Sequence, residues 1–136
     1  MAFTLVLIYM GLLGFGAMIS PGIGFSGEMI AMLPPPVVDF SHAPAYGLLT
    51  WLLTGGLAGR GWPRRYALLV ATAGATVFGV WMEIFQGSVP GRVADIGDVV
   101  VNSAGIGTAA LLILWRALPV DGTDGLPPAR PLTPVG

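Results

Sequence analysis

The stretch Gly79–Gly107, GVWMEIFQGSVPGRVADIGDVVVNSAGIG, decides the expected fold, because it joins the end of one apolar segment to the start of another through a short polar connection. Only 10% of the residues of the chain are charged. Against that background, the stretch gathers three carboxylates, one arginine and two amides: Glu83, Gln86, Arg92, Asp95, Asp98 and Asn102. This concentration makes it the first candidate for a functional site.

Composition favours a membrane protein. The 136 residues suit one domain, 54% of them are hydrophobic, and the mean hydropathy is +0.81, well above that of soluble domains. Cysteine is absent, so there is no disulfide framework, thiolate metal site or cysteine nucleophile. The net charge is −1 and lysine is absent, so no basic surface is available for a run of phosphates, and nucleic-acid binding is excluded.

Four apolar segments are close to the length of about 20 residues that a membrane-spanning helix needs. They cover residues 3–19, 42–58, 66–86 and 98–118. The first lacks the positive residues that precede the apolar core of a secretory signal, so we expect it to be a retained helix. The sequence therefore predicts an all-α membrane protein, a four-transmembrane-helix bundle over residues 1–118. The Pro- and Gly-rich segment 119–136 is expected to be a disordered cytoplasmic tail.

The connection between the first two spans holds a short apolar segment and three prolines. Residues 26–33 are expected to form an interfacial helix, and residues 34–36, all proline, an extended connection. Asp39 or Ser41 is expected to cap the next helix. Pro44 then falls in its first turn, where a missing N–H is tolerated.

Small and polar residues recur every three or four positions in three of the segments. Ala71, Ala75 and Gly79 follow the small-xxx-small pattern that lets membrane helices approach closely, and the next position on that stripe is Glu83. The two other stripes are His42-Tyr46-Thr50-Thr54 and Asp98-Asn102-Gly105-Ala109. Since residues four apart share one helix face, we expect the three stripes to meet inside the bundle.

Basic residues in short loops predict the orientation. Arginines in the 60–65 connection and Arg116 favour the cytoplasmic side of the inner (cytoplasmic) membrane. Both termini are then cytoplasmic. The polar cluster is expected at the outer face, and it consists of His42, Glu83, Gln86, Arg92, Asp95, Asp98 and Asn102.

The ordered series of these residues resembles the VanZ-like family of small bacterial membrane proteins. The resemblance covers about residues 39–107 and rests on Gly79, Glu83, Gln86, Pro90-Gly91-Arg92, Asp95, Asp98, Asn102, Gly105 and Gly107, with His42 and Tyr46 upstream. Phe40 occupies the position where the family commonly has a lysine, and Ala43 follows the histidine where an aromatic residue is common. The resemblance implies a four-helix membrane protein, linked in one named case to low-level teicoplanin resistance, and it supplies no established reaction.

The favoured interpretation is an outward-facing binding site for a lipid or glycolipid head group or an amphiphilic antibiotic. Arg92 would hold a phosphate or carboxylate, and Gln86 and Asn102 would bind hydroxyls or amides. Tyr46 and Asp95 complete the candidate ligand-binding residues. No cofactor or resident metal is expected.

Two alternatives stay open. An intramembrane hydrolase would use His42 as a general base beside Glu83 or Asp98, and a metal-dependent enzyme would hold a divalent ion on His42 and two carboxylates. Alternatively, the cluster is structural, with Asp95 or Asp98 capping the last helix, Arg92 paired with Glu83 or Asp95, and Asn102 hydrogen-bonded across helices. In that case the chain would be a structural or transport-complex subunit. Four helices are few for a transporter, so a transport role would call for a homo-oligomer formed through the Ala71-Ala75-Gly79 stripe.

Overall fold

A computed structural model describes residues 2–117, which form five helices and no strand. The helices are α1 (Ala2–Ala17), α2 (Gly24–Ala31), α3 (Pro35–Ala58), α4 (Arg64–Gln86) and α5 (Ile96–Trp115). The all-α expectation is confirmed for this part of the chain. The expected tail, residues 119–136, lies outside the described residues.

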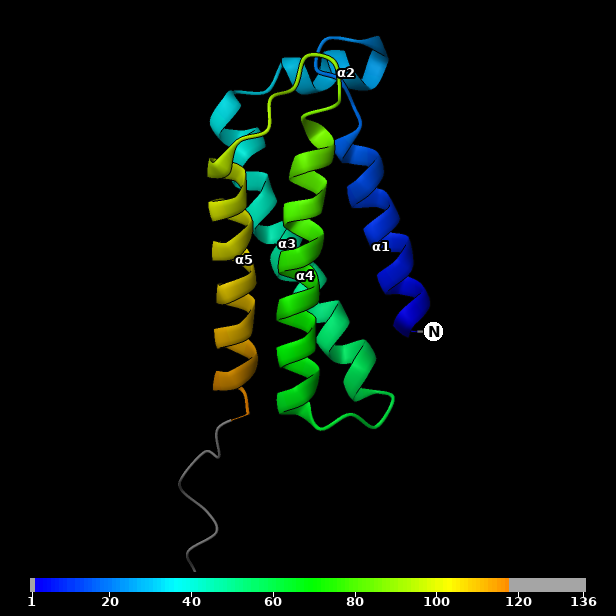
Figure 1. Ribbon diagram of the computed structural model, residues 1–136, viewed down its shortest axis with the longest axis vertical. Helices are drawn as coiled ribbons and strands as arrows, with labels where there is room; N and C mark the ends of the chain where they lie inside the picture. The colour runs from blue at the N-terminus through cyan, green and yellow to red at the C-terminus, as the bar shows by residue number, and fades with distance from the viewer. Residues whose placement is uncertain (1, 118–136) are drawn as a thin grey trace, which may run out of the picture.

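Four helices run along the length of the molecule, and α2 lies across one end (Figure 1). The central helix is α3, which packs against α1, α4 and α5, while α1 touches α4 only slightly. Near one end of the bundle, Gly56 of α3 lies against Val6 and Phe3 of α1. Farther along α1, the Tyr9 hydroxyl donates to the carbonyl oxygen of Ala45 at 3.0 Å. The connections between α3, α4 and α5 are short, as the sequence predicted.

Helix α3 begins earlier than expected. It starts at Pro35, and Pro34 precedes it with an extended backbone (φ −57°, ψ 135°), so the prediction of an extended connection through residue 36 is wrong. A proline fits the first helical positions, where no N–H acceptor exists. No side chain caps this helix. Asp39 and Ser41 therefore lie within it, and Pro44 is an interior proline and not a first-turn residue.

The predicted stripes do face the interior. Ala71, Ala75, Gly79 and Glu83 are all buried on α4. On α3, the Thr50 hydroxyl donates to the Tyr46 carbonyl at 2.9 Å and the Thr54 hydroxyl to the Thr50 carbonyl at 2.8 Å. Bonds of this kind satisfy buried hydroxyls within their own helix. The core cluster that these stripes flank consists of Tyr46, Leu49, Ala75 and Ile106.

The closest helix approach joins α3 to α5. A Cβ atom added to Gly105 would overlap the carbonyl oxygen of Ala43, and one added to Gly47 would lie 3.1 Å from the carbonyl oxygen of Gly105. On α4, a Cβ at Gly79 would lie 3.1 Å from the Tyr46 ring. Glycines at these contacts let three backbones converge just below the polar end of the bundle.

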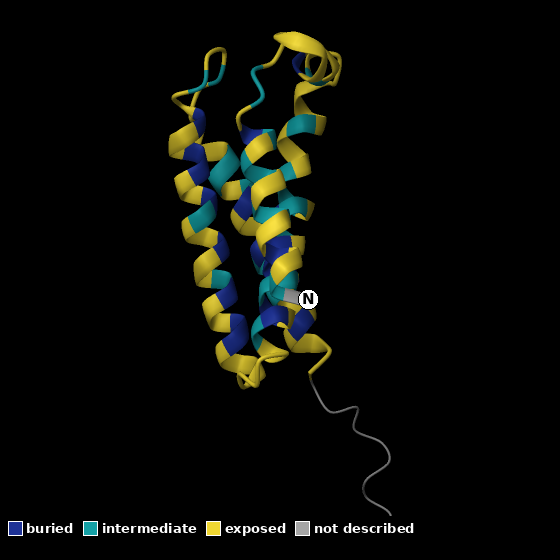
Figure 2. Cartoon of the chain, turned by 90° about the vertical axis from the view of Figure 1, so that its right-hand side faces the viewer, coloured by how far each residue is buried: buried dark blue, intermediate teal, exposed yellow. Residues whose placement is uncertain are grey.

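Figure 2 shows that much of the outer surface along the sides of the bundle is exposed, and many of the exposed residues are large and hydrophobic. Helices α4 and α5 are long and apolar enough to cross a membrane by length and composition, and only 33% and 28% of their apolar stretches are buried. Large side chains such as Leu69, Val77, Trp81 and Leu111 are more than half exposed. Their exposure sets these helices apart from core helices of soluble domains, whose apolar residues are mostly inside.

Candidate functional site

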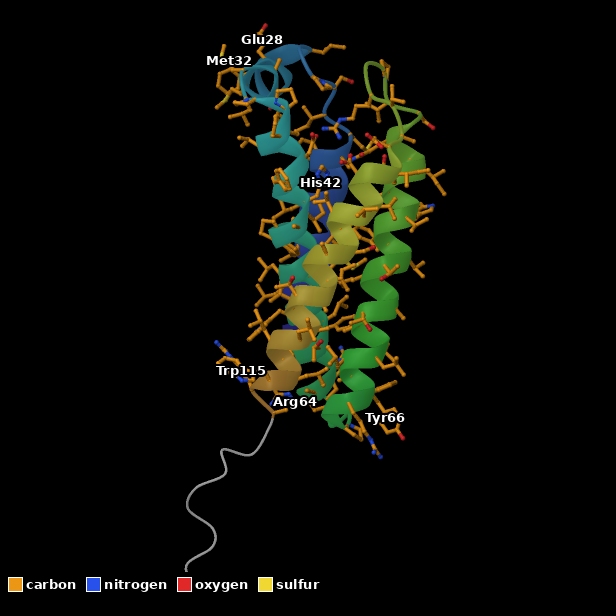
Figure 3. The ribbon with its side chains drawn as sticks, turned by 90° about the vertical axis from the view of Figure 1, so that its left-hand side faces the viewer. Glu28, Met32, His42, Arg64, Tyr66 and Trp115 are labelled. Atoms are coloured by element: carbon orange, nitrogen blue, oxygen red, sulfur yellow. The ribbon has the colours of Figure 1, made fainter. Side chains whose placement is uncertain are left out.

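The residues of the 79–107 stretch gather at the end of the bundle that α2 covers. Figure 3 shows Glu28, Met32 and His42 toward this end and Arg64, Tyr66 and Trp115 at the other. This polar end comprises α2, the first turns of α3, the last turn of α4, the connection to α5 and the first turn of α5. It holds the carboxylates found within residues 2–117: Glu28, Asp39, Glu83, Asp95 and Asp98.

A cleft of about 330 Å³ opens at this end, and we call it the polar cleft. Its charged and polar lining residues come from α3, α4, the connection and α5: Asp39, His42, Gln86, Arg92, Asp95 and Asp98. Ile30 and Ala31 of α2, together with Leu33, form an apolar part of its wall. Five of the predicted site residues therefore line a single cleft, although they lie on four different segments.

A second cleft, of about 280 Å³, adjoins the first, and we call it the apolar cleft. Leu12 and Leu13 of α1 and Val37 and Tyr46 of α3 line it. The two clefts share six lining residues: Ile30, Leu33, Val38, His42, Gln86 and Arg92. The polar residues among these six mark the boundary between a charged compartment and an apolar one.

Arg92 is held by a tight turn at this boundary. Gly91 has a φ of +80°, a conformation that glycine adopts readily, and the Arg92 N–H donates to the Val89 carbonyl at 3.1 Å. The Nε atom of Arg92 is buried and has no hydrogen-bond partner within residues 2–117. The expected pairing with Glu83 or Asp95 therefore does not satisfy this donor.

Glu83 has a structural partner. Its side chain is 6% exposed, and its Oε1 accepts the backbone N–H of Asp95 at 2.5 Å. Asp95 in turn caps α5 by accepting the Gly97 N–H on Oδ1 at 2.8 Å. These two bonds fix the start of α5 to the end of α4. Glu83 lines neither cleft, so this candidate catalytic residue supports the site from outside its walls.

Asn102 lies deeper, where α3, α4 and α5 converge. It is 4% exposed, and an added Cβ on Gly79 would meet both its amide nitrogen and the Tyr46 ring. Its Oδ1 is buried without a partner within the described part of the chain. The hydrogen bond across helices that the sequence suggested is therefore missing for this oxygen, and Asn102 lines neither cleft.

His42 lines both clefts, and Asp39 and Asp98 share the polar cleft with it. Its Nδ1 lies 3.1 Å from the Asp39 carbonyl oxygen, which orients the ring. Across residues 2–117 there is no group of three His, Asp or Glu side chains arranged to hold a metal ion. The His42 metal site that the sequence allowed is not assembled in this conformation.

Sequence reasoning missed two parts of the site. Asp39 was expected to be a cap, and it lines the polar cleft because α3 starts before it. Ile30 and Leu33, at the end of α2 and just after it, line both clefts. Their apolar character was visible in the sequence, although nothing there indicated that this segment folds over the polar cluster.

In comparisons with protein-family models, with curated proteins and with solved structures, the chain has no match.

Proposed function

We propose that the chain is a four-span inner-membrane protein of VanZ-like type, with both termini cytoplasmic. Its polar cleft faces outward and recognises the head group of an envelope lipid or an amphiphilic antibiotic. In this proposal its partners are the bilayer and that ligand, and it contributes to glycopeptide (teicoplanin) tolerance by occupying or presenting the ligand at the outer leaflet.

The exposed apolar sides of the bundle support the four spans. Helix α3 has 24 residues and so reaches ~36 Å at 1.5 Å per residue, more than the ~30 Å hydrocarbon core. Helix α1 has 16 residues, all of them uncharged, and is apolar though shorter. In the same bundle, α3 packs against α4 and α5, and α1 packs against α3. Four roughly aligned helices with lipid-facing apolar surfaces are the arrangement expected of a small membrane bundle.

The distribution of arginines supports the orientation. Arg60, Arg64, Arg65 and Arg116 lie at the end opposite the polar cleft. Loops rich in arginine stay on the cytoplasmic side, so the cleft opens outward. A reporter enzyme fused after the last residue tests this orientation: an alkaline phosphatase fusion is expected to be inactive, and an active one would overturn it.

The observation that carries the proposed binding function is the buried, unpartnered Nε of Arg92 beside a cleft. A buried donor without an acceptor is destabilising, because it has lost its hydrogen bonds to water and forms none within the protein. A phosphate or carboxylate in the polar cleft would supply that acceptor with a charge-assisted hydrogen bond. The Arg92 side chain as a whole is half-buried and lines both clefts, so a ligand in the polar cleft would meet this cation.

Replacing Arg92 tests the binding site. Arg92→Ala is expected to raise the dissociation constant for phospholipid about 10- to 100-fold, because hydrogen bonds to charged groups contribute about 1.5–3 kcal/mol. Native mass spectrometry of the purified full chain measures lipid retention, and a tolerance assay in cells measures the phenotype. Arg65→Ala, at the opposite end, is the matched control. Unchanged lipid binding and unchanged tolerance in folded Arg92→Ala protein would sink the proposal.

An enzyme is the second candidate, because His42 and Asp98 line the same cleft. His42 would act as a general base, with Asp98 as the partnering carboxyl. Because Glu83 accepts the backbone N–H of Asp95, we give it no catalytic role in this alternative. His42→Gln distinguishes the two: a binding protein keeps its lipid affinity and its phenotype, whereas an enzyme keeps affinity and loses turnover.

A homo-oligomer would have to use a surface other than the Ala71 stripe. Ala71, Ala75 and Gly79 are buried within the chain itself, so they are not free to contact a second copy. A purely structural role for the cluster predicts instead that His42→Gln and Arg92→Ala both reduce the amount of folded protein. The detergent-corrected mass of the purified chain measures its oligomeric state directly.

A further inference from the structure

We infer that the preferred ligand is a phospholipid whose head group carries both a phosphate and a primary ammonium, with the ammonium held by the carboxylates of the polar cleft. This inference rests on the proposed function, since it names the ligand class of the same site. It follows from the positive and negative charges that line the polar cleft, and from the position of the apolar cleft beside it.

The charges of the polar cleft do not suit a simple anion. One guanidinium, that of Arg92, faces a wall that also contains Asp39, Asp95 and Asp98. A head group bearing only negative charge would be attracted by Arg92 and repelled by the carboxylates. At these short distances the attraction and the repulsion are of similar size, so they oppose each other. A zwitterionic head group pairs with both signs at once.

The carboxylates differ in how much of their hydrogen-bonding capacity is free. Asp95 already uses Oδ1 to cap α5. Asp39 is exposed and Asp98 half-buried, and no side-chain hydrogen bond engages either carboxylate in the structure from residue 2 to residue 117. Their oxygens can accept the N–H donors of a primary ammonium, which a quaternary ammonium does not offer.

The compartments occur in the order of the chemical groups of such a lipid. The carboxylates Asp95 and Asp98 line only the polar cleft. Arg92 and Gln86 lie at the boundary, and Leu12 and Leu13 line only the apolar cleft. An ammonium among the aspartates, a phosphate on Arg92 and the start of an acyl chain against α1 would follow this order without a turn in the ligand.

The sizes of the clefts agree with this placement. Volumes of about 330 and 280 Å³ lie near the lower end of the roughly 300–1,000 Å³ of small-molecule sites. The polar cleft accommodates a head group and the apolar cleft the beginning of one chain. The remaining acyl carbons would stay in the surrounding membrane, where Leu12 and Phe15 are 61% and 68% exposed.

The test compares three phospholipids with identical short acyl chains and different head groups. Isothermal titration calorimetry of the purified full chain in detergent would use dioctanoyl phosphatidylethanolamine, phosphatidylglycerol and phosphatidylcholine. The ethanolamine lipid is expected to bind about tenfold more tightly than the glycerol lipid, as one added charge-assisted hydrogen bond implies. The choline lipid is expected to fall between them, because it keeps the positive charge and lacks the N–H donors.

Two carboxylate variants locate the ammonium. Asp39→Asn and Asp98→Asn are each expected to reduce the preference for the ethanolamine lipid to about threefold or less. Asp39 is exposed, so its variant keeps the test informative if Asp98→Asn yields no folded protein. Glu28→Gln is the matched control, because Glu28 is exposed on α2 and lines neither cleft.

The outcomes separate this inference from the function on which it rests. Arg92-dependent binding of all three lipids with the glycerol lipid equal or tighter would overturn the ammonium site and leave the proposed function standing. A preference for ethanolamine that survives in both aspartate variants would also overturn it. Lipid binding that does not depend on Arg92, or no binding at all, would remove the proposed function and the inference together.

Discussion

The arginine side chains at the two ends of the bundle differ in whether they have partners within the protein. At the end away from the clefts, Arg60 lies 4.0 Å from the centre of the Phe3 ring and Arg116 lies 5.0 Å from that of Trp51. Arg64 donates to the Ile113 carbonyl at 3.4 Å. These side chains have partners within the protein. At the polar end, the Arg92 Nε is buried and has none within residues 2–117.

Under the proposed function, this difference separates an end whose arginines stabilise the fold from an end whose arginine binds a ligand. Rings and a carbonyl contact the arginines of the first end, and the proposed topology places these charges on the cytoplasmic side. At the polar end, the Nε of Arg92, a residue that lines both clefts, is unsatisfied, while the unsatisfied amide oxygen of Asn102 lies deeper in the bundle and outside the cleft walls. An unsatisfied buried donor lowers stability, so its place in a residue of the cleft wall supports the proposed ligand there.

Gly105→Leu is expected to abolish the fold of the polar end. A Cβ at this position already overlaps the Ala43 carbonyl oxygen, so α3 and α5 would be forced apart. We expect a loss of about 3 kcal/mol or more, at the upper end of overpacking effects, measured by thermal unfolding in detergent. Gly107→Leu is the matched control, because nothing lies within 4 Å of a Cβ there. Equal melting temperatures of the two variants would contradict the close approach.

Glu83→Ala is expected to lower the free energy of unfolding by about 1–3 kcal/mol, because the Asp95 N–H would lose its charged acceptor. Glu83→Gln keeps an oxygen at the same place and should lose less. Chemical unfolding in mixed micelles measures both, with Glu28→Ala on the exposed face of α2 as the control. If the Glu83→Gln protein kept its stability and lost an enzymatic activity, Glu83 would again be a candidate catalytic residue.

The interior of the bundle could be predicted from the sequence because burial in a helix follows a fixed spacing. Residues four apart share a face, so the small residues of the third segment placed Glu83 and its stripe inside. The same rule placed Tyr46, Thr50 and Thr54 on one buried face of α3. Spacing of this kind depends only on local geometry, which the sequence specifies directly.

The start of α3 and the clefts could not be predicted in the same way. A run of prolines can end a helix or begin one, since only interior positions need the missing N–H. The clefts depend on where α2 lies, and its Ile30 lines the same two clefts as Arg92, which is far away in the sequence. Such tertiary placement has no local signal, so Asp39 was assigned to a cap instead of the cleft wall.

Asn102→Leu is expected to raise the free energy of unfolding by about 1 kcal/mol, because it removes an unsatisfied buried oxygen and keeps a side chain of similar shape. Ser103→Ala, on an exposed position of the same helix, is the control and should change stability by less than about 0.5 kcal/mol. Unfolding in mixed micelles measures both. A destabilised Asn102→Leu protein would mean that the oxygen has a partner in the folded state, and the contrast between the two ends would weaken.

Arg60→Ala is expected to have the smallest effect, and it completes the comparison from the other end. Its contact with the Phe3 ring is a cation–π interaction worth about 0.5–1 kcal/mol at an exposed site. Unfolding of Arg60→Ala, Phe3→Leu and the double variant measures the coupling between the two side chains. Lipid affinity should stay unchanged in all three, in contrast to Arg92→Ala, which should lose affinity and keep its stability. If Arg60→Ala weakened lipid binding as much as Arg92→Ala does, the arginines could not be divided into anchoring and binding groups, and the ligand would have to contact both ends of the bundle.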